Sequence, residues 1–368
     1  MMTNWIPQYI TNGITESSNS QTLMKDLPKN EQVGMLMLEL RKTNSATIYN
    51  TRSIMDEITK IEIIADGSKV IASAQPEVLS YLAFVAQGGE VPDHRFFKGG
   101  AAVQRLHLPI WFGRYPWDEE YLLDTGQYST VQVWITYALD TAYSASGSFQ
   151  HTITYWRPLT KLPVKGFIRS REIKVEVPSA AAQTIRHDLP VTYPWHLVGA
   201  RIHDVDQDIN TNLTGIELNI DSGRLLLVDT DADEIYYENM RKFRPAHGYV
   251  NQPVVIGAET DVQTFGEWAF PRGAVTVSGN RLPVLTGLAG ETVDITVYVA
   301  DTGVAATDAI PIALDMPSSM PHKCMLIGDF RKWPFPIRNY KEAWIDYVMA
   351  AYTITLRTFV QEVVAEKL

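Results

Sequence analysis

Residues Ile58 to Tyr81 read I-T-K-I-E-I-I-A-D-G-S-K-V-I-A-S-A-Q-P-E-V-L-S-Y, and a related stretch occurs later in the chain. Residues Leu213 to Tyr236 read L-T-G-I-E-L-N-I-D-S-G-R-L-L-L-V-D-T-D-A-D-E-I-Y and align with the first stretch without a gap. In each copy an alternating apolar run is followed by a turn signal, Asp66-Gly67 or Asp221-Ser222-Gly223, and then by a second apolar run. Each copy is therefore predicted to form a β-hairpin.

A short helix is predicted directly after each hairpin. Pro76 stands at an early helical position, and apolar residues follow it at helical spacing. The corresponding segment in the second copy is Ala232 to Phe243. Residues Asp229 to Glu234 read D-T-D-A-D-E and are interpreted as its N-cap and first turn, because negative side chains there favour the helix dipole; metal binding is the minor alternative.

Two shorter matches keep the same order along the chain. Thr130-Val131-Gln132-Val133 aligns with Thr292-Val293-Asp294-Ile295, and Thr152-Ile153-Thr154 recurs as Thr353-Ile354-Thr355. Further segments rich in β-branched and aromatic residues predict strands at Gly34–Leu40, Val103–Phe112, Phe149–Trp156, Ile173–Val177 and Trp195–Val205. The expected fold is all-β: two tandem eight-stranded jelly rolls, a double jelly roll, with short helices in loops.

The chain is divided into three segments. Residues 1–30 are expected to be an N-terminal arm, residues 31–165 the first jelly roll and residues 166–368 the second, with the boundary in the Pro-rich and basic connection from Arg157 to Arg169. The arm carries Trp5, Ile6, Tyr9, Ile10 and Ile14 at a spacing that suits an amphipathic helix. Such an arm docks on its own domain, on a neighbouring subunit or on a membrane surface.

Composition narrows the functional classes. The formal net charge of −10 gives no overall positive footprint for neutralising phosphates, which argues against sequence-specific binding of nucleic acid. The single cysteine, Cys324, excludes an internal disulfide framework and is interpreted as a small buried residue. Neither a membrane-spanning apolar run nor a secretory signal is recognised, so synthesis in the host cytoplasm is expected.

The chain resembles the double jelly-roll major capsid proteins of tailless icosahedral viruses, the lineage of internal-membrane bacteriophages and, more distantly, adenovirus hexon. The resemblance covers both predicted jelly rolls. It is carried by Glu57–Ile71 (E-I-T-K-I-E-I-I-A-D-G-S-K-V-I), by the helix ending near Ala86, and by Leu106–Arg114 (L-H-L-P-I-W-F-G-R).

This resemblance implies a virion protein that self-assembles as homotrimers, each a pseudo-hexagonal capsomer in an icosahedral shell. The partners it implies are further copies of the chain, minor vertex proteins and an inner membrane reached through the N-terminal arm. The alternative is a jelly-roll carbohydrate- or receptor-binding viral spike protein, and a third hypothesis is a jelly-roll enzyme acting on carbohydrate. The leading interpretation is not an enzyme and requires no cofactor.

One constellation has the ligand type of a calcium site. Asp204, Asp206 and Asp208, followed by Asn210 and Asn212, present alternate oxygen donors of the kind that Ca²⁺ binds. The run lacks the central glycine and closing glutamate of an EF-hand loop, and the same alternation suits a solvated strand edge. Calcium therefore remains one of two interpretations, and no metal ligand is assigned.

Other candidate sites receive non-catalytic interpretations. Trp117-Asp118-Glu119-Glu120 offers the neighbouring carboxylates that glycosidases use, but a solvated loop tip is the preferred interpretation. Lys323 to Arg338 mixes basic and aromatic residues as nucleic-acid sites do, and an intersubunit contact is preferred. The eight histidines lack zinc-site spacing. No residue is assigned a catalytic role.

Overall fold

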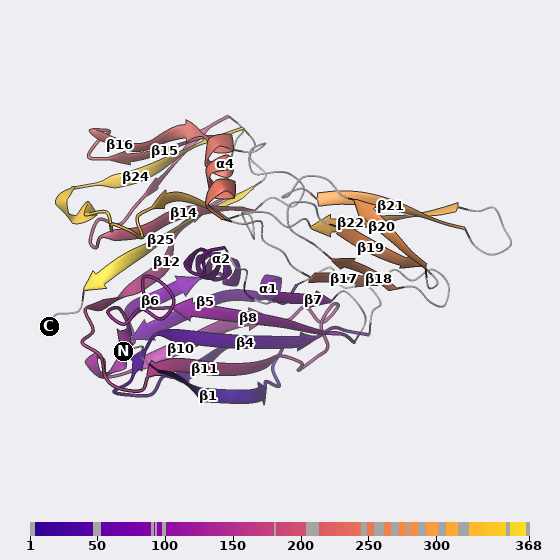
Figure 1. Ribbon diagram of the computed structural model, residues 1–368, viewed down its shortest axis with the longest axis horizontal. Helices are drawn as coiled ribbons and strands as arrows, with labels where there is room; N and C mark the ends of the chain where they lie inside the picture. The colour runs from indigo at the N-terminus through magenta and orange to yellow at the C-terminus, as the bar shows by residue number, and fades with distance from the viewer. Residues whose placement is uncertain are drawn as a thin grey trace.

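The computed structural model describes residues 4–46, 53–89, 92, 94–97, 101–179, 182–203, 213–243, 324–350 and 354–365, and the backbone of six strands between residues 249 and 315. Two β-sandwiches lie one above the other in Figure 1, with the six strands to one side. Those strands are β17 (Tyr249–Pro253), β18 (Asp261–Phe265), β19 (Arg272–Val277), β20 (Asn280–Leu285), β21 (Thr292–Ala300) and β22 (Thr307–Asp315).

The first sandwich has two four-stranded faces. One runs in the order β1 (Trp5–Thr15), β11 (Gln150–Pro158), β4 (Met35–Thr43) and β8 (Val103–Trp111). The other runs β2 (Ser20–Asp26), β10 (Val131–Ala138), β5 (Ile58–Ala65) and β6 (Lys69–Ala74). Numbered by their place along the chain, these principal strands run 1-8-3-6 and 2-7-4-5, which is a jelly roll. The short strands β3 (Gln32–Val33), β7 (His94–Phe97) and β9 (Leu123–Asp124) and the turn α1 (Ile54–Glu57) lie outside this scheme.

The second sandwich repeats the first. One face runs β12 (Gly166–Glu176), β25 (Thr355–Ala365), β14 (Trp195–His203) and β23 (Cys324–Asp329). The other runs β13 (Thr184–Asp188), β24 (Ala343–Met349), β15 (Leu213–Ile220) and β16 (Leu225–Asp231). The orders are again 1-8-3-6 and 2-7-4-5, so the predicted double jelly roll is confirmed. The expected division between residues 165 and 166 falls between β11 and β12.

The duplicated stretch forms the same unit in both jelly rolls. Hairpin β5–β6 leads into α2 (Pro76–Ala86), and β15–β16 leads into α4 (Ala232–Lys242), with Asp231 as its N-cap. Both hairpins carry a register shift at the same place, Ile63/Ile64 in one and Leu218/Asn219 in the other. The strand pairing also shows that the turn of the second hairpin is one residue longer than that of the first. After the turn, structurally equivalent residues are therefore offset by one position from the ungapped sequence alignment.

The repeated turn aspartates perform the same task. Asp66 and Asp221 have φ angles of 50° and 49°, and each accepts a backbone N–H from a residue just before the strand beside the hairpin. The donor is Ser129 at 2.7 Å in the first jelly roll and Lys341 at 2.8 Å in the second. The two turns are thus anchored to the start of β10 and of β24, respectively.

This anchoring corrects one predicted match. The alignment of Thr130–Val133 with Thr292–Ile295 made β21 the counterpart of β10, but β21 pairs with β22 in a separate two-stranded sheet. The strand that pairs with β15 as β10 pairs with β5 is β24. The two segments share the short pattern T-V-x-V/I because both are β-strands rich in β-branched residues, and they do not hold equivalent places in the fold. In the T-I-T match, by contrast, Thr152–Thr154 lie in β11 and Thr355 begins β25, and these two strands hold the same place in their sheets.

The predicted N-terminal arm and its helix are wrong for residues 4–30. Residues 5–15 form β1, paired with β11, and residues 20–26 form β2, paired with β10. Register shifts between Tyr9 and Thr11 and between Thr11 and Ile14 interrupt the two-residue alternation of β1. These irregularities space its apolar residues by three and four positions, which is the pattern expected of a helix.

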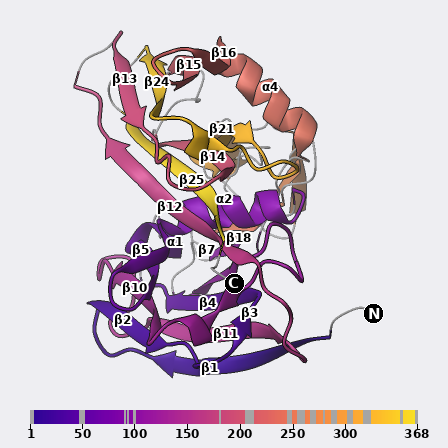
Figure 2. The ribbon, with the colours of Figure 1, turned by 90° about the vertical axis from the view of Figure 1, so that its left-hand side faces the viewer.

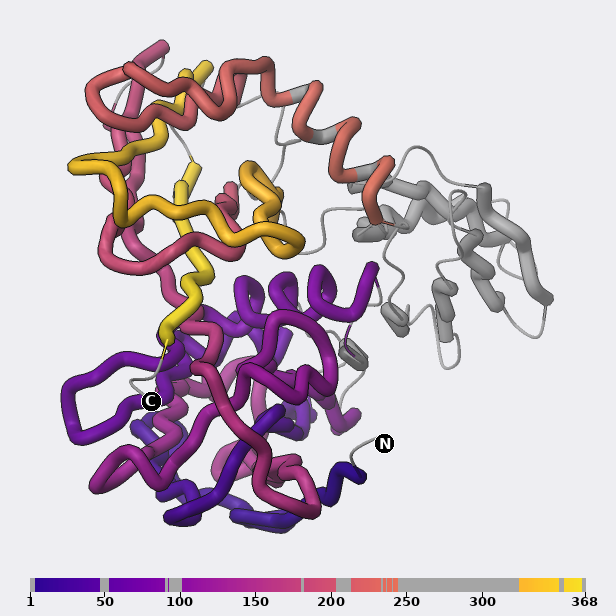
Figure 3. The backbone as a smooth tube through the Cα atoms, turned by 60° about the vertical axis from the view of Figure 1, so that its left-hand side comes forward, coloured from indigo at the N-terminus to yellow at the C-terminus, as the bar shows by residue number. Residues whose placement is uncertain are grey.

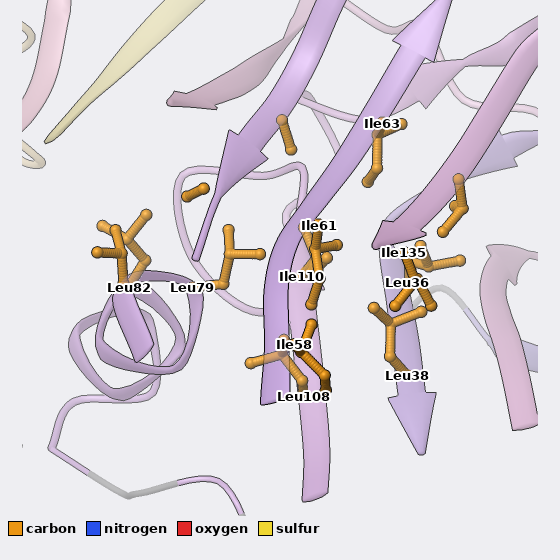
Figure 4. Close-up of a cluster of buried hydrophobic side chains, with 14 of the residues drawn as sticks. Leu36, Leu38, Ile58, Ile61, Ile63, Leu79, Leu82, Leu108, Ile110 and Ile135 are labelled. Carbon is orange, nitrogen blue, oxygen red and sulfur yellow. The ribbon is translucent and has the colours of Figure 1, made fainter. Parts of the chain in front are cut away.

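Apolar side chains from both sheets fill the first sandwich. Figure 4 shows Leu36, Leu38, Leu108 and Ile110 from one sheet against Ile58, Ile61, Ile63 and Ile135 from the other, with Leu79 and Leu82 of α2 beside them. Most of these side chains are almost completely buried, so the alternating pattern of each strand faces a common core.

Candidate assembly interface

The two jelly rolls are joined through their strands. Strand β6 of the first pairs in parallel with β12 of the second, with Ala72 opposite Ser170 and Ser73 opposite Arg171. This contact merges one sheet from each jelly roll into a sheet of eight strands. Helix α2 lies between the two jelly rolls, as Figure 3 shows in purple. The two jelly rolls are therefore joined by strand pairing and by a helix packed between them.

Helix α2 covers the outer face of the second jelly roll. Leu197, Leu326 and Phe359 belong to the same apolar cluster as the core of the first jelly roll, whereas Val198 and Val360 point into the second core. The sheet β12-β25-β14-β23 is thus apolar on both faces. The ring of Tyr81 on α2 lies 5.9 Å from that of Phe359, and its hydroxyl donates to Asn239 of α4 at 3.1 Å.

Charged groups border this apolar contact. Arg201 of β14 donates to Glu77 of α2 at 3.1 Å and to Gln75 at 2.7 Å. Glu172 of β12 accepts the backbone N–H of Gln75 at 3.0 Å and a bond from Arg357 at 3.1 Å. Burial raises the pKa of the Glu77 carboxyl, and Arg201 opposes that rise. One Glu77 oxygen lacks a hydrogen-bond partner among the described residues.

A small cavity remains at the joint. It has a volume of about 20 Å³ and is lined by residues that include Trp111, His196, Ser170 and Gln361. The Nε1 of Trp111 and the Nδ1 of His196 lack hydrogen-bond partners within the described part of the chain. Burial lowers the pKa of His196 to about 4, so the imidazole is neutral at pH 7. The cavity has room for a water molecule and is too small for a sugar.

The predicted solvated tip at residues 117–120 is wrong for Asp118, which is 1% exposed. Its carboxylate accepts the backbone N–H of Arg114 at 3.1 Å and the guanidinium Nε at 2.8 Å. Both Asp118 and Glu120 raise the pKa of Arg114. The Trp117 ring lies 5.0–5.3 Å from those of three other tryptophans, Trp5, Trp111 and Trp156. These carboxylates hold a loop instead of facing a substrate cleft.

In the basic and aromatic stretch, of which residues 324–338 are described, two phenylalanine rings pack inside the chain. Trp195 and Phe335 exchange backbone hydrogen bonds of 2.9 and 3.0 Å, and their rings stack at 5.8 Å. Phe330 packs against both rings. Of this stretch, Trp333 is 78% exposed. Phe330 and Phe335 therefore pack against the second core as partly buried side chains, and the intersubunit contact stays a prediction.

Sequence reasoning missed a buried ion pair. Lys42 of β4 and Glu57 of α1 are almost fully buried, and their Nζ and Oε2 atoms are 2.8 Å apart. Ser144 donates to both oxygens of Glu57 at 2.8 and 2.9 Å. Hydrogen bonding compensates these buried charges, which fixes the end of β4 against the loop after β10. The residues are too far apart in sequence to form a recognisable motif.

The remaining candidate ligands do not form a centre in the described residues. Cys324 is buried, as predicted, and burial raises the pKa of its thiol. No group of three or more His, Cys, Asp or Glu side chains there could hold a metal ion. The calcium candidates Asp204, Asp206 and Asp208 lie outside the described residues. Among the helices that are described, none is long and apolar enough to cross a membrane.

Solved structures with a similar fold include viral major capsid proteins. A chain of Sulfolobus turreted icosahedral virus superposes with a TM-score of 0.60 at 10% identity, covering 97% of this chain and 90% of that chain. The major capsid protein of STIV gives 0.57 at 10% identity, with coverage of 97% and 96%. That of bacteriophage PM2 gives 0.52 at 9% identity, with coverage of 99% for both. No protein-family model and no curated protein matches the sequence. The shared feature is the fold, a double jelly roll.

Proposed function

We propose that this chain is the major capsid protein of a tailless icosahedral virus. The likeness to the STIV major capsid protein spans 97% of this chain and 96% of that chain, and this observation carries the proposal. Single jelly rolls occur in lectins and enzymes as well as in capsids. Here the likeness includes both jelly rolls and their succession along the chain, which is a more specific property than one sandwich.

The proposed unit of assembly is a homotrimer whose six jelly rolls give a pseudo-hexagonal outline. Such units tile the shell of a virion, with minor proteins at the vertices and synthesis in the host cytoplasm. The role is structural, and no residue is assigned to catalysis. The net charge of −10 supports a shell whose contacts are with protein rather than with specific nucleic-acid sequences.

The test is the mass of the purified chain by multi-angle light scattering, with negative-stain imaging of the same sample. The proposal predicts a trimer of about three times 41.4 kDa with a pseudo-hexagonal outline, or closed shells. A stable monomer at all accessible concentrations would contradict it. Screening that monomer for glycan binding would then test the spike-protein alternative.

A further inference from the structure

We propose that the joint between the two jelly rolls is acid-sensitive: one water molecule bridges Trp111 of the first jelly roll and neutral His196 of the second, and protonation of His196 opens the joint. Figure 2 shows this joint, with α2 between β14 above it and β4 below it. The inference goes beyond the proposed function and does not depend on it, because both sides of the joint belong to one chain.

The cavity at the joint takes its lining from both jelly rolls. Its volume is about 20 Å³. Trp111 at the end of β8 and Leu82 of α2 come from the first jelly roll. Ser170 of β12, His196 of β14 and Gln361 of β25 come from the second. A change in what fills or charges this cavity therefore acts on both jelly rolls at once.

Two buried polar atoms at the cavity have no hydrogen-bond partner within the described residues, the Nε1 of Trp111 and the Nδ1 of His196. Trp111 is 8% exposed and His196 is 2% exposed. The Nε2 of His196 lies 3.2 Å from the carbonyl oxygen of Arg114. Because a carbonyl oxygen only accepts, Nε2 carries the proton of the neutral ring and Nδ1 is an acceptor, whereas the indole Nε1 only donates. A water molecule that accepts from Trp111 and donates to His196 satisfies both atoms, and the cavity has the volume for one.

Protonation of His196 breaks this pattern of hydrogen bonds. The charged ring carries a proton on both nitrogens, so its Nδ1 becomes a donor like the Nε1 of Trp111. Ser170 adds a further donor at the cavity, because its oxygen accepts from Gln361 at 2.9 Å and its own proton is left to donate. The water then faces donors where it needs an acceptor. The positive charge of the ring is also buried, which is costly without a counter-ion.

The charged groups on the elements packed around His196 form ion pairs with one another. These pairs are Arg114 with Asp118 and Glu120 after β8, Arg331 with Asp329 after β23, Arg169 and Arg171 of β12 with Glu362 of β25, Arg357 of β25 with Glu172 of β12, and Arg201 of β14 with Glu77 of α2. Burial lowers the pKa of His196 to about 4, and the hydrogen bond to the Arg114 carbonyl and the charge of Asp329 offset this only in part.

The direction of the pH effect follows from the two states of the joint. Opening hydrates His196, which then has the ordinary histidine pKa of about 6.5. Between that value and about 4 the open joint binds more protons than the closed joint, so the equilibrium constant for opening rises as the pH falls. The rise is at most about tenfold per pH unit, or about 300-fold over the window. Glu77 opposes it, because burial raises the pKa of that carboxyl and its protonation favours the closed joint.

The single cysteine of the chain supplies a probe of opening. Cys324 is 0% exposed and belongs to the apolar cluster that joins the first core to β14, β23 and β25, so it faces the joint. Its rate of reaction with dithiodipyridine, divided by the rate for the urea-unfolded chain at the same pH, measures the equilibrium constant for its exposure. A urea dependence weaker than that of global unfolding identifies the exposure as opening of the joint.

The key variant is His196→Gln, which keeps an Nε2 donor for the Arg114 carbonyl but cannot take up the proton. As the pH falls from about 6.5 to about 4, the opening constant of the wild type should rise relative to that of this variant by up to about 300-fold. His107→Gln, at a partly exposed site on β8 that does not line the cavity, is the matched control. An equal pH dependence in the wild type and His196→Gln, or its loss in His107→Gln instead, would overturn the inference.

A second variant keeps the test decisive if His196→Gln does not fold. Glu77→Gln removes the opposing carboxyl and retains His196, so its opening constant should rise more steeply on acidification than that of the wild type. No rise in this variant would also overturn the inference. Light scattering at each pH checks that the oligomeric state is constant, and a stable monomer would refute the proposed function while leaving this test intact.

The water bridge has a test of its own. A crystal structure at neutral pH should show one water molecule within hydrogen-bond distance of the Trp111 Nε1 and the His196 Nδ1. Trp111→Phe keeps an aromatic ring and removes the donor, so it should raise the opening constant at neutral pH by about 2–10-fold. An empty cavity in the crystal, or an unchanged opening constant in Trp111→Phe, would show that no water joins the two jelly rolls at this site.

Discussion

Helices α2 and α4 occupy the same place in the two jelly rolls but differ in what surrounds them. The sequence of α2 is P-E-V-L-S-Y-L-A-F-V-A and nearly all of it is buried. That of α4 is A-D-E-I-Y-Y-E-N-M-R-K, with Ala232, Ile235 and Asn239 buried and Glu234, Glu238, Arg241 and Lys242 exposed. Both helices pack on their own sandwich, and only α2 also has the other jelly roll above it. Local sequence thus records the number of faces that a helix must bury.

The largest expected contrast is between the two tyrosines at the sixth helix position. Tyr81→Ala should lower the free energy of unfolding by about 3–5 kcal/mol, because it empties a packed site between the jelly rolls. Tyr237→Ala should change it by less than about 0.5 kcal/mol in the dilute monomer, where the side chain is exposed. Denaturant titration followed by circular dichroism measures both. Equal losses would show that the two helices are not in different environments.

The pH dependence of stability tests the difference between the first turns of α2 and α4. Burial raises the pKa of Glu77, so the folded chain binds this proton more tightly than the unfolded chain. This tighter proton binding stabilises the folded chain at pH values below the ordinary carboxyl pKa of about 4.3. The stabilisation is lost as the pH rises through the pKa that Glu77 has in the folded chain. The stability of the wild type minus that of Glu77→Gln should therefore fall as the pH rises above about 4.3.

The size of that fall reports the pKa difference, at about 1.4 kcal/mol per pKa unit. Denaturant titrations at half-unit pH steps measure it. The matched control is Glu234→Gln at the start of α4, where the side chain is exposed, and its stability is measured over the same pH steps. A rising difference for Glu77→Gln would mean that the ion pair with Arg201 outweighs burial.

The sequence was sufficient to predict the duplicated hairpins and the jelly-roll class, because each hairpin depends on local signals. Turn residues such as Asp66 and Gly67 adopt positive φ angles, and alternate apolar residues face one core. Strand β1 was missed because its register shifts disturb that alternation. Strand β24 was missed because its role depends on pairing with β15 rather than on its own composition.

The side-chain contacts of the candidate site were harder to predict because they join residues that other parts of the chain bring together. Asp118 was expected at a solvated tip, and only the folded loop shows that Arg114 encloses it. Lys42 and Glu57 are brought together by strand packing, which no spacing rule describes. Similarly, a tyrosine in a helix gives no sign of whether another jelly roll covers it. The difference between the exposed Tyr237 and the buried Tyr81 is seen only when the two folded jelly rolls are compared.

The smallest expected effects concern the two turns, where the repeated units should behave alike. Gly67 and Gly223 have φ angles of 71° and 78°, and a Cβ atom would meet nothing closer than 3.9 Å at either site. Alanine should therefore cost about 1 kcal/mol at each position through backbone strain alone. Asparagine, which tolerates the left-handed region better, is the matched control and should cost less. Denaturant midpoints measure the stability of all four variants. Clearly unequal losses for the two alanine variants would show that the two turns are not structurally equivalent.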